Sequence, residues 1–222
     1  ETSGKTVYMV SSDGVPSTFR FLAGSDRIRT QLDDLIGGYD LIISVDAAEL
    51  SRVGTVLDGL PQPQLNIDHH ITNTNFAQVN LVDPLAVACS EMLALLIPDL
   101  GLPLTQPVAE ALLTGILTDT IGFRTNNMST RALRVAASLM ENGANLPEIY
   151  NRALLQHSFP AIRFWGNGLS HLQRDGRIVW ATLTMEDRKQ AGYAGRDDAD
   201  LINVLSSIRD TDIAVIFVEQ PD

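Results

Sequence analysis

The sequence predicts an α/β protein in which a mostly parallel sheet is flanked by helices and followed by a smaller, incomplete α/β domain. Runs rich in β-branched residues alternate with helical patterns through the first two thirds of the 222 residues, which is typical of strand–helix–strand units. Proline, glycine and aromatic residues then gather at 158–171. We therefore expect a first domain at 1–157, a connecting helix or linker at 158–171 and a second domain at 172–222.

Three strands are expected in the first domain, at 6–10, 41–45 and 64–67. The second ends in Asp46, and the third runs directly into Asp68. The carboxyl ends of parallel strands line the crevice where open α/β sheets bind their substrates. Asp46 and Asp68 are therefore expected at a binding site.

Helical spacing of apolar residues predicts three helices in the same domain, at 108–117, 128–141 and 145–156. The first of them delivers Asp119 just beyond its predicted end. Asn145 is expected to cap the start of the third, because a side-chain oxygen at that position accepts a hydrogen bond from the first turn. These three helices follow the three predicted strands in the sequence.

The second domain is expected to contain a strand at 177–184, a helix at 197–208 and a strand at 213–218. The last strand is strongly apolar, as central strands of a sheet usually are. The sequence stops four residues after it. We therefore expect this domain to be incomplete.

The composition restricts the class of substrate. Sixteen basic residues face 27 acidic ones, which gives a net charge of -11. A broad basic surface for duplex DNA is therefore not expected. Small phosphorylated molecules and short single strands remain compatible, because metal ions bound at an acidic site present local positive charge to phosphate.

Cys89 is the single cysteine, so no disulfide forms within the chain, and we expect it to be a small buried residue on a helix. No apolar run reaches the length of a membrane span, and residues 1–5 do not resemble a signal peptide. The sequence therefore predicts a cytoplasmic protein without a membrane partner.

Asp68, His69 and His70 form the most informative cluster, because three potential ligands follow one strand. Asp46 and Asp119 stand at the ends of two other predicted elements. Taken singly, a strand-end aspartate is often a turn residue, and the alternative interpretation of Asp119 is that it only terminates its helix. Taken together, carboxylates and imidazoles without cysteine suit Mn²⁺ or Mg²⁺ better than structural zinc. We expect Mn²⁺, water activated by the metal and hydrolysis of a phosphoester.

Three segments resemble motifs of the DHH phosphoesterase family, which includes RecJ-like exonucleases, family II inorganic pyrophosphatases and cyclic-dinucleotide phosphodiesterases. Residues 44–49 resemble the second motif, 66–70 the third and 115–123 the fourth, in the same order and spacing. Segments 66–75 and 115–124 are most similar to the nanoRNase/pAp-phosphatase branch. The resemblance implies a DHH domain at 1–157 and a partial DHHA1-type substrate-binding domain at 172–222.

The resemblance also implies roles for individual residues. Asp46 would bridge two Mn²⁺ ions in the intact protein, with Mg²⁺ or Co²⁺ as alternatives, and His69 and Asp119 would ligate one of them. His70 would act in catalysis by facing the substrate phosphate or orienting the site, supported by Asp68.

Arg124 follows the fourth motif directly. The resemblance implies that its guanidinium contacts a phosphate of the substrate. An ordinary surface arginine is the alternative interpretation of this position.

Two expected segments of the family have no match. The first motif, an Asp-rich strand and loop that supplies ligands to the other metal, would precede Gly4, and residues 1–6 do not resemble it. A Gly-rich loop of the C-terminal domain would lie beyond Asp222. We therefore expect either a chain truncated at both ends or a natural variant that lacks these segments.

The function expected from the resemblance is metal-dependent hydrolysis of short oligonucleotides (nanoRNA), of 3'-phosphoadenosine 5'-phosphate, or of both. A RecJ-like single-strand exonuclease is one alternative, although it would need a longer basic groove. A non-catalytic nucleotide-binding module, or a truncated inactive fragment, is another. The oligomeric state stays open, with a homodimer as one option.

Overall fold

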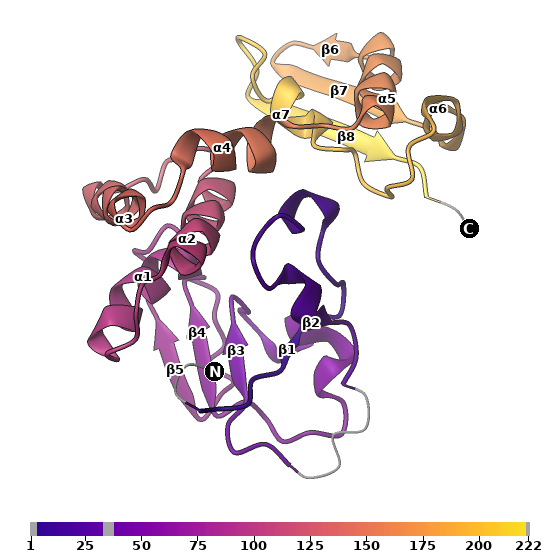
Figure 1. Cartoon of the computed structure of the whole chain (residues 1–222). Helices are drawn as coiled ribbons and strands as arrows, with labels where there is room; N and C mark the ends of the chain where they lie inside the picture. The colour runs from indigo at the N-terminus through magenta and orange to yellow at the C-terminus, as the bar shows by residue number, and fades with distance from the viewer. Residues whose placement is uncertain (1–3, 33–37, 221–222) are drawn as a thin grey trace. The chain divides into compact units, whose positions relative to one another are not determined.

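The computed structural model describes residues 4–32 and 38–220 and divides the chain into two compact units, 1–155 and 156–222 (Figure 1). Glu1–Ser3, part of the segment considered for the first motif, lies outside the described residues. Each unit has its own buried hydrophobic cluster, as expected of a separate domain.

Of the two alternatives expected at 158–171, a connecting helix or a linker, the structure shows a helix, since Phe159–Ser170 forms α5 and belongs to the second unit. Ser158 caps this helix by accepting a hydrogen bond from the amide of Ala161. Pro160 occupies the first turn, where its missing N–H costs nothing. Phe164 is fully buried in the core of the unit. The proline and glycines that suggested a linker are thus tolerated within a helix that packs through its apolar face.

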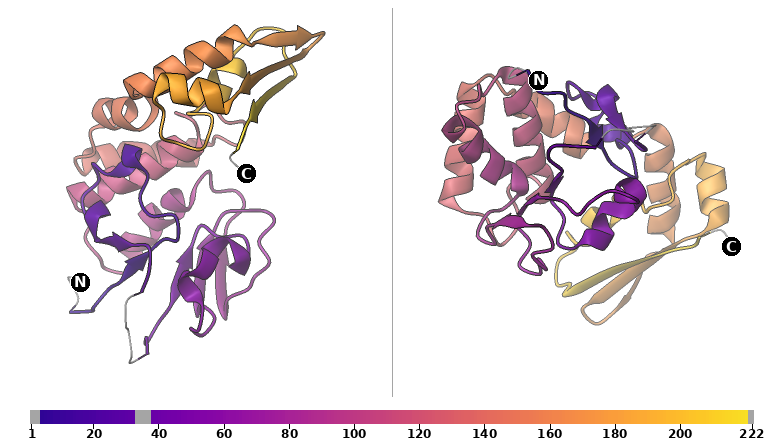
Figure 2. Two further views of the ribbon diagram at one scale, coloured as in Figure 1. Left: turned by 90° about the vertical axis from the view of Figure 1, so that its right-hand side faces the viewer. Right: turned by 90° about the horizontal axis from the view of Figure 1, so that it is seen from below.

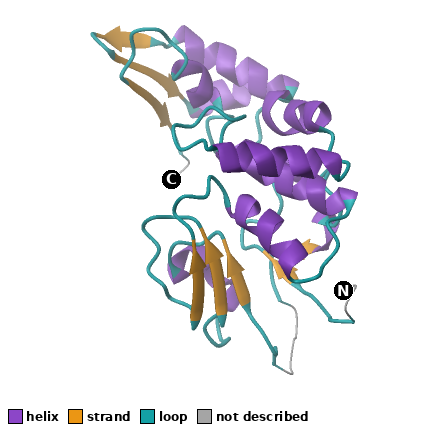
Figure 3. Ribbon diagram, turned by 90° about the vertical axis from the view of Figure 1, so that its left-hand side faces the viewer, coloured by secondary structure: helices purple, strands orange, loops and turns teal. Residues whose placement is uncertain are grey.

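A parallel three-stranded sheet carries the polar clusters of the first unit (Figure 3). Its order is β3 (Ile43–Val45), β4 (Leu65–Asp68) and β5 (Val79–Val82). Strands predicted at 41–45 and 64–67 are therefore confirmed. The sequence analysis missed β5, whose four residues are too short a pattern to separate from a loop.

A second, two-stranded parallel sheet is formed by β1 (Met9–Val10) and β2 (Ile28–Arg29). The strand predicted at 6–10 is therefore present only over its last two residues. Between the strands, the chain makes 3₁₀ turns at Ser17–Phe19 and Ser25–Arg27. A longer 3₁₀ segment, Leu50–Leu57, follows β3 and is kinked at Gly54, where φ is 71°.

The helices of the first unit agree with most of the predicted periodicity. They are α1 (Cys89–Asp99), α2 (Gln106–Asp119), α3 (Thr130–Glu141) and α4 (Leu146–Tyr150), followed by a π-helical turn at Asn151–Leu155. Asn145 caps α4 as predicted, since its side chain accepts a hydrogen bond from the amide of Glu148 at 3.3 Å. The Asn145 cap thus begins α4 where the sequence indicated.

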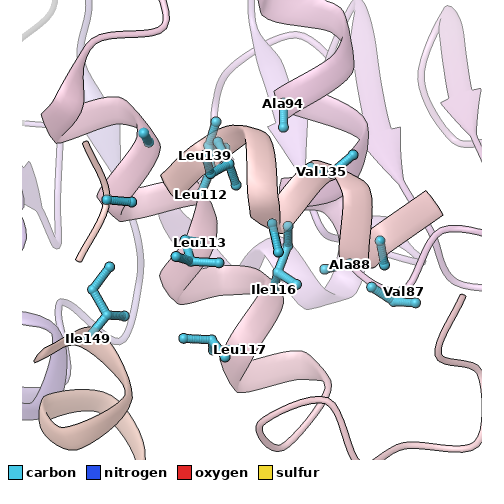
Figure 4. Close-up of a cluster of buried hydrophobic side chains, with 14 residues drawn as sticks. Val87, Ala88, Ala94, Leu112, Leu113, Ile116, Leu117, Val135, Leu139 and Ile149 are labelled. Carbon is cyan, nitrogen blue, oxygen red and sulfur yellow. The ribbon is translucent and has the colours of Figure 1, made fainter. Parts of the chain in front are cut away.

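Helices α1, α2 and α3 contribute to one buried cluster, shown in Figure 4. Leu113, Ile116 and Leu117 of α2 are completely buried there, and Leu139 of α3 joins them. A smaller cluster made of Ile67, Ala86 and Met92 connects β4 to α1. The sheet and the helical layer are therefore held together beside the end of β4, where the polar residues emerge.

The second unit consists of a three-stranded sheet with helices on one face (Figure 2). Strand β7 (Ile178–Leu183) pairs antiparallel with β6 (Gln173–Asp175) and parallel with β8 (Ile213–Val218). The predictions of strands at 177–184 and 213–218 are therefore confirmed.

Helices α5, α6 (Met185–Ala191) and α7 (Leu201–Leu205) contribute to the core of the second unit. Only Leu201–Leu205 of the helix predicted at 197–208 forms. The residue before it, Asp200, has φ of 66°, which is incompatible with an α-helix. Asp198 then accepts a hydrogen bond from the amide of Ile202 at 2.9 Å. Local side-chain hydrogen bonding thus replaces the first helical turn.

None of the helices within residues 4–32 and 38–220 combines the length and apolar character needed to span a membrane.

Leu139→Ala is expected to lower the free energy of unfolding by about 2–5 kcal/mol, because it leaves a cavity in the core of the first unit. Leu133→Ala on the same helix is the matched control, since Leu133 is 51% exposed, and its effect should stay within about 0.5 kcal/mol. Urea denaturation followed by circular dichroism checks both values. Equal destabilisation by the two variants would contradict the assignment of the core.

Candidate metal site

Asp46 occupies the turn that ends β3, in a backbone conformation that few residue types adopt. Its φ is 62°, and its amide donates a hydrogen bond to the carbonyl of Ile67 at 2.9 Å. Asp and Asn tolerate this left-handed region better than β-branched residues do. Backbone strain of this kind is often found at functional sites, and here it turns the chain where the carboxylate of Asp46 meets the histidines.

Two asparagines hold the Asp46 turn against the segment that carries the histidines. Asn66, fully buried on β4, and Asn73 each donate a hydrogen bond of 3.1 Å to the carbonyl of Ala47. Asn73 also donates to the carboxylate of Asp68. The sequence analysis assigned no role to either asparagine, although a polar side chain within a buried strand pattern is a signal that could have pointed to Asn66.

His69 lies at the centre of the site. Its Nδ1 is 3.2 Å from the carbonyl oxygen of Ala86, an acceptor, so this nitrogen carries the proton in the neutral ring. The other nitrogen, Nε2, is 3.4 Å from Asp46 Oδ1 and 3.6 Å from Asp119 Oδ2. A nitrogen lone pair between two carboxylates is favourable only when a proton or a metal cation lies among them.

The donor atoms fit a small cation that prefers oxygen and imidazole ligands. One donor atom from each of Asp46, His69 and His70 lies within 4.8 Å of the others. Asp119, the last residue of α2, adds a carboxylate on the other side of His69. This set of donors suits a divalent metal ion, and an N–H donated by the distal ring nitrogen to a carbonyl is the usual support for a ligating histidine.

The charges of the site influence one another. The hydrogen bond with His69 lowers the pKa of Asp46, and the same contact raises the pKa of His69. Burial raises the pKa of Asp119, and the charge of Asp46 raises it further. Two carboxylates thus compete for the positive charge of one imidazole. A bound cation would relieve that competition.

Asp68 lies beneath His70 and fixes its orientation. His70 Nδ1 is 2.7 Å from Asp68 Oδ1, and Asp68 is fully buried. Burial raises the pKa of Asp68, but hydrogen bonds from His70 and Asn73 outweigh it, so the net pKa is lowered. Asp68 therefore stays ionised, which leaves Nε2 of His70 as the ring nitrogen that faces other groups.

Cys89 is buried as the first residue of α1, which confirms the structural role predicted for it. Its Sγ lies 3.4 Å from the carbonyl oxygen of Ile67 and 4.0 Å from Asp68 Oδ1. Burial, together with the charges of Asp46 and Asp68, raises the pKa of the thiol above its usual range. Cys89 therefore remains a protonated thiol and is neither a nucleophile nor a thiolate ligand in this state.

Arg124 lies in the turn that follows α2, and its guanidinium is exposed. The turn is tight, with Ile121, Gly122 and Phe123 all at positive φ. Arg124 Nε donates a hydrogen bond of 3.0 Å to the carbonyl of Ile121. This bond holds Nε of Arg124 near the turn and does not involve its two terminal nitrogens.

The structure thus brings together five of the six residues that the sequence analysis selected. Contacts connect Asp46, Asp68, His69, His70 and Asp119 into one cluster. Arg124 is five residues beyond Asp119 and donates its hydrogen bond to Ile121, within its own turn.

Comparison with known proteins gives relatives along almost the entire chain. This chain is 35% identical to the bifunctional oligoribonuclease and PAP phosphatase NrnA of Thermus thermophilus over 216 residues, which are 96% of its length. The protein of the same name from Mycoplasma genitalium is 29% identical over 198 residues, 86% of this chain. The chain spans 63% of the length of the first relative and 60% of the second. No family model matches the chain.

A solved structure shows the same fold. The exopolyphosphatase-related protein of Bacteroides fragilis superposes with a TM-score of 0.85 over 95% of this chain and 66% of its own, at 24% sequence identity. This likeness supports the α/β architecture that the sequence predicted. The sequence similarity to the oligoribonuclease and PAP phosphatase proteins, which extends over 96% of this chain, agrees with its resemblance to the DHH phosphoesterases.

Proposed function

We propose that the intact protein is a metal-dependent phosphohydrolase that cleaves short oligonucleotides, 3'-phosphoadenosine 5'-phosphate, or both. The observation that supports this most directly is that donor atoms of Asp46, His69 and His70 lie within 4.8 Å of one another. Asp119 Oδ2 adds a carboxylate oxygen 3.6 Å from His69 Nε2. The name shared by the Thermus thermophilus and Mycoplasma genitalium relatives, oligoribonuclease and PAP phosphatase, supports the class of substrate.

In this proposal, Asp46, His69 and Asp119 would hold a Mn²⁺ ion, and Asp46 would also serve a second ion. When bound, the metal supplies Lewis-acid chemistry, acidifying water and stabilising negative charge on a phosphoryl group. His69 contributes Nε2, because its Nδ1 is engaged with the carbonyl of Ala86. The protein thus presents the imidazole in the tautomer that a metal requires.

His70 is proposed to face the substrate phosphate through Nε2. Its Nδ1–H is held by the carboxylate of Asp68 at 2.7 Å, so the ring cannot turn without breaking a buried hydrogen bond. Asp68 would also stabilise the imidazolium whenever Nε2 carries a proton. A proton held at Nε2 is able to hydrogen-bond a phosphoryl oxygen or to be passed to a leaving alkoxide.

Arg124 is proposed to contact a phosphate of the substrate at the edge of the site. Its guanidinium is exposed and offers donors that match phosphate oxygens. The chain as a whole carries a net charge of -11, so attraction of phosphate depends on local positive charge. Arg124 and bound metal would supply it, which favours short substrates over long duplexes.

The two units are assigned separately in this proposal. The first unit, 1–155, is proposed to belong to the catalytic DHH domain, and the second unit, 156–222, to a DHHA1-type substrate-binding domain. The metal-site cluster supports the assignment of the first unit, and the separate three-stranded sheet supports that of the second.

Asp119→Asn is expected to lower Mn²⁺-dependent hydrolysis of an end-labelled dinucleotide, or of 3'-phosphoadenosine 5'-phosphate, by at least about 100-fold. That loss corresponds to about 2.7 kcal/mol of transition-state stabilisation. The reason is that an amide binds Mn²⁺ more weakly than a carboxylate does. Asp99→Asn, an equal charge change at the exposed end of α1, is the matched control and should retain activity.

The assay compares two samples, the chain of 222 residues and the full-length protein, which is called the parent below. Hydrolysis by the parent that survives Asp119→Asn unchanged would argue against the proposed ligand set. A parent that binds Mn²⁺ but never turns over either substrate would favour a nucleotide-binding module instead.

Binding of Mn²⁺ is expected to weaken as the pH falls, because the metal requires neutral His69 and ionised Asp119. The hydrogen bond to Asp46 raises the pKa of His69 above 6.5, and burial raises that of Asp119. The loss of affinity should therefore begin above pH 6.5, at up to about tenfold per pH unit for each displaced proton. Isothermal titration calorimetry across this range measures it.

Without metal, the sign of the His69 effect on stability is the opposite. A raised folded-state pKa contributes stability that is fully present below the unfolded value of 6.5 and is lost as pH rises through the raised value. His69→Gln should flatten both pH dependences in this window. An unchanged pH profile in that variant would show that another group controls metal binding.

A further inference from the structure

We infer that Arg131, Glu91 and Asp83 form an ionic clamp that positions His69 for metal binding, acting through the carbonyl of Ala86. The inference rests on the proposed function and extends it to residues outside the site. None of the three clamp residues contacts Asp46, His70 or Asp119 in the interactions described above. They are positioning residues, since they act on His69 through the backbone of one loop.

The clamp is formed by one guanidinium that bridges two carboxylates. Arg131 Nε donates to Glu91 Oε1 at 2.6 Å, and Arg131 Nη2 donates to Asp83 Oδ2 at 2.8 Å. The second oxygen of Glu91 accepts a hydrogen bond of 2.7 Å from the amide of Val87. Glu91 is fully buried, so both of its oxygens are paired away from water.

These contacts fix the loop between β5 and α1 at both of its ends. At one end, the amide of Asp83 donates to the carbonyl of Asp68 at 3.0 Å, which ties the loop to the end of β4. At the other end, Glu91 holds Val87. Ala86 lies between these two ties, and its own amide donates to the carbonyl of Asp83 at 3.0 Å. The position of the Ala86 carbonyl is therefore determined from both sides.

That carbonyl is the hydrogen-bond partner of His69 Nδ1, at 3.2 Å. It decides which nitrogen of the ring carries the proton and where Nε2 points. Ala86 is almost completely buried, so the loop cannot move toward solvent to release His69. A displaced carbonyl would free the ring to rotate or to change tautomer.

The helical core supports the clamp from the other side. Val87 and Ala88 of the loop belong to the same buried cluster as Val135 of α3 (Figure 4). Arg131 lies one turn before Val135 on that helix. The hydrophobic contact and the ionic clamp therefore join the same loop to the same helix.

Burying the Glu91 carboxylate beside the half-exposed Arg131 is an expensive way to stabilise a loop, because desolvation of the buried charge offsets much of the attraction. Apolar residues of similar volume would hold α1 and α3 together at least as well. The clamp provides what apolar packing does not, a fixed direction for backbone groups on both sides of Ala86. This directional constraint is what a metal-ligating histidine needs.

Two conservative substitutions test the inference in the folded protein. Arg131→Lys keeps the positive charge but cannot bridge both carboxylates in the same geometry. Glu91→Gln keeps the volume but replaces one of the two acceptor oxygens with a donor group. Each variant is expected to weaken Mn²⁺ affinity about 10–100-fold, measured by isothermal titration calorimetry.

A second readout does not need metal. At alkaline pH, where the imidazole is neutral, ¹⁵N NMR of the metal-free protein should show His69 as a single tautomer protonated at Nδ1. In the clamp variants, the spectrum should shift toward a mixture of tautomers. This readout separates the two proposals, because it still reports on positioning if the wild-type protein does not bind Mn²⁺.

Leu139→Ala is the control for loss of stability alone, since Leu139 lies in the core on the same helix as Arg131. At a temperature where it is folded, its Mn²⁺ affinity should stay within about twofold of wild type, as expected for an independent site. Folded clamp variants with wild-type affinity and a single His69 tautomer would overturn the inference. An equal loss of affinity in Leu139→Ala would overturn it as well.

Discussion

The hydrogen bond between His69 Nδ1 and the carbonyl of Ala86 is the interaction on which the site depends. It directs Nε2 toward Asp46 and Asp119, at 3.4 and 3.6 Å. Without it, the ring could turn its protonated nitrogen toward the carboxylates and satisfy them as an ordinary hydrogen-bond donor. With this hydrogen bond, the unprotonated Nε2 lies near the carboxylates of Asp46 and Asp119, and a cation among these three groups is favourable.

The parallel register of the sheet decides that these groups meet. Val45 on β3 is paired with Ile67 on β4, so the residues that follow the two strands leave the sheet at neighbouring points. Asp46 turns through positive φ, and Asp68 remains in the strand beneath His70. The last residue of α2 then reaches the same point. The polar cluster is thus assembled from the ends of three elements, as in many α/β proteins.

Polar residues inside the fold serve the site more than they serve stability. Asn66, Asn73 and Asp68 are joined to the Asp46 turn or to the histidines by hydrogen bonds. Glu91 is fully buried and is paired with the half-exposed Arg131. Such groups cost desolvation energy and return little net stability. Their value lies in fixing the directions of donor atoms, which a purely apolar core would leave free.

The sequence by itself determined the positions of most strands and helices and the choice of Asp46, Asp68, His69, His70 and Asp119, because apolar periodicity and strand-end polar residues are local signals. Tertiary structure decided the rest. Helix α5 (159–170) owes its helical state to a core that neighbouring residues cannot reveal, and α7 is short because Asp198 and Asp200 make local turns. The clamp joins residues 48 positions apart, and contacts across such a separation exist only after the chain has folded.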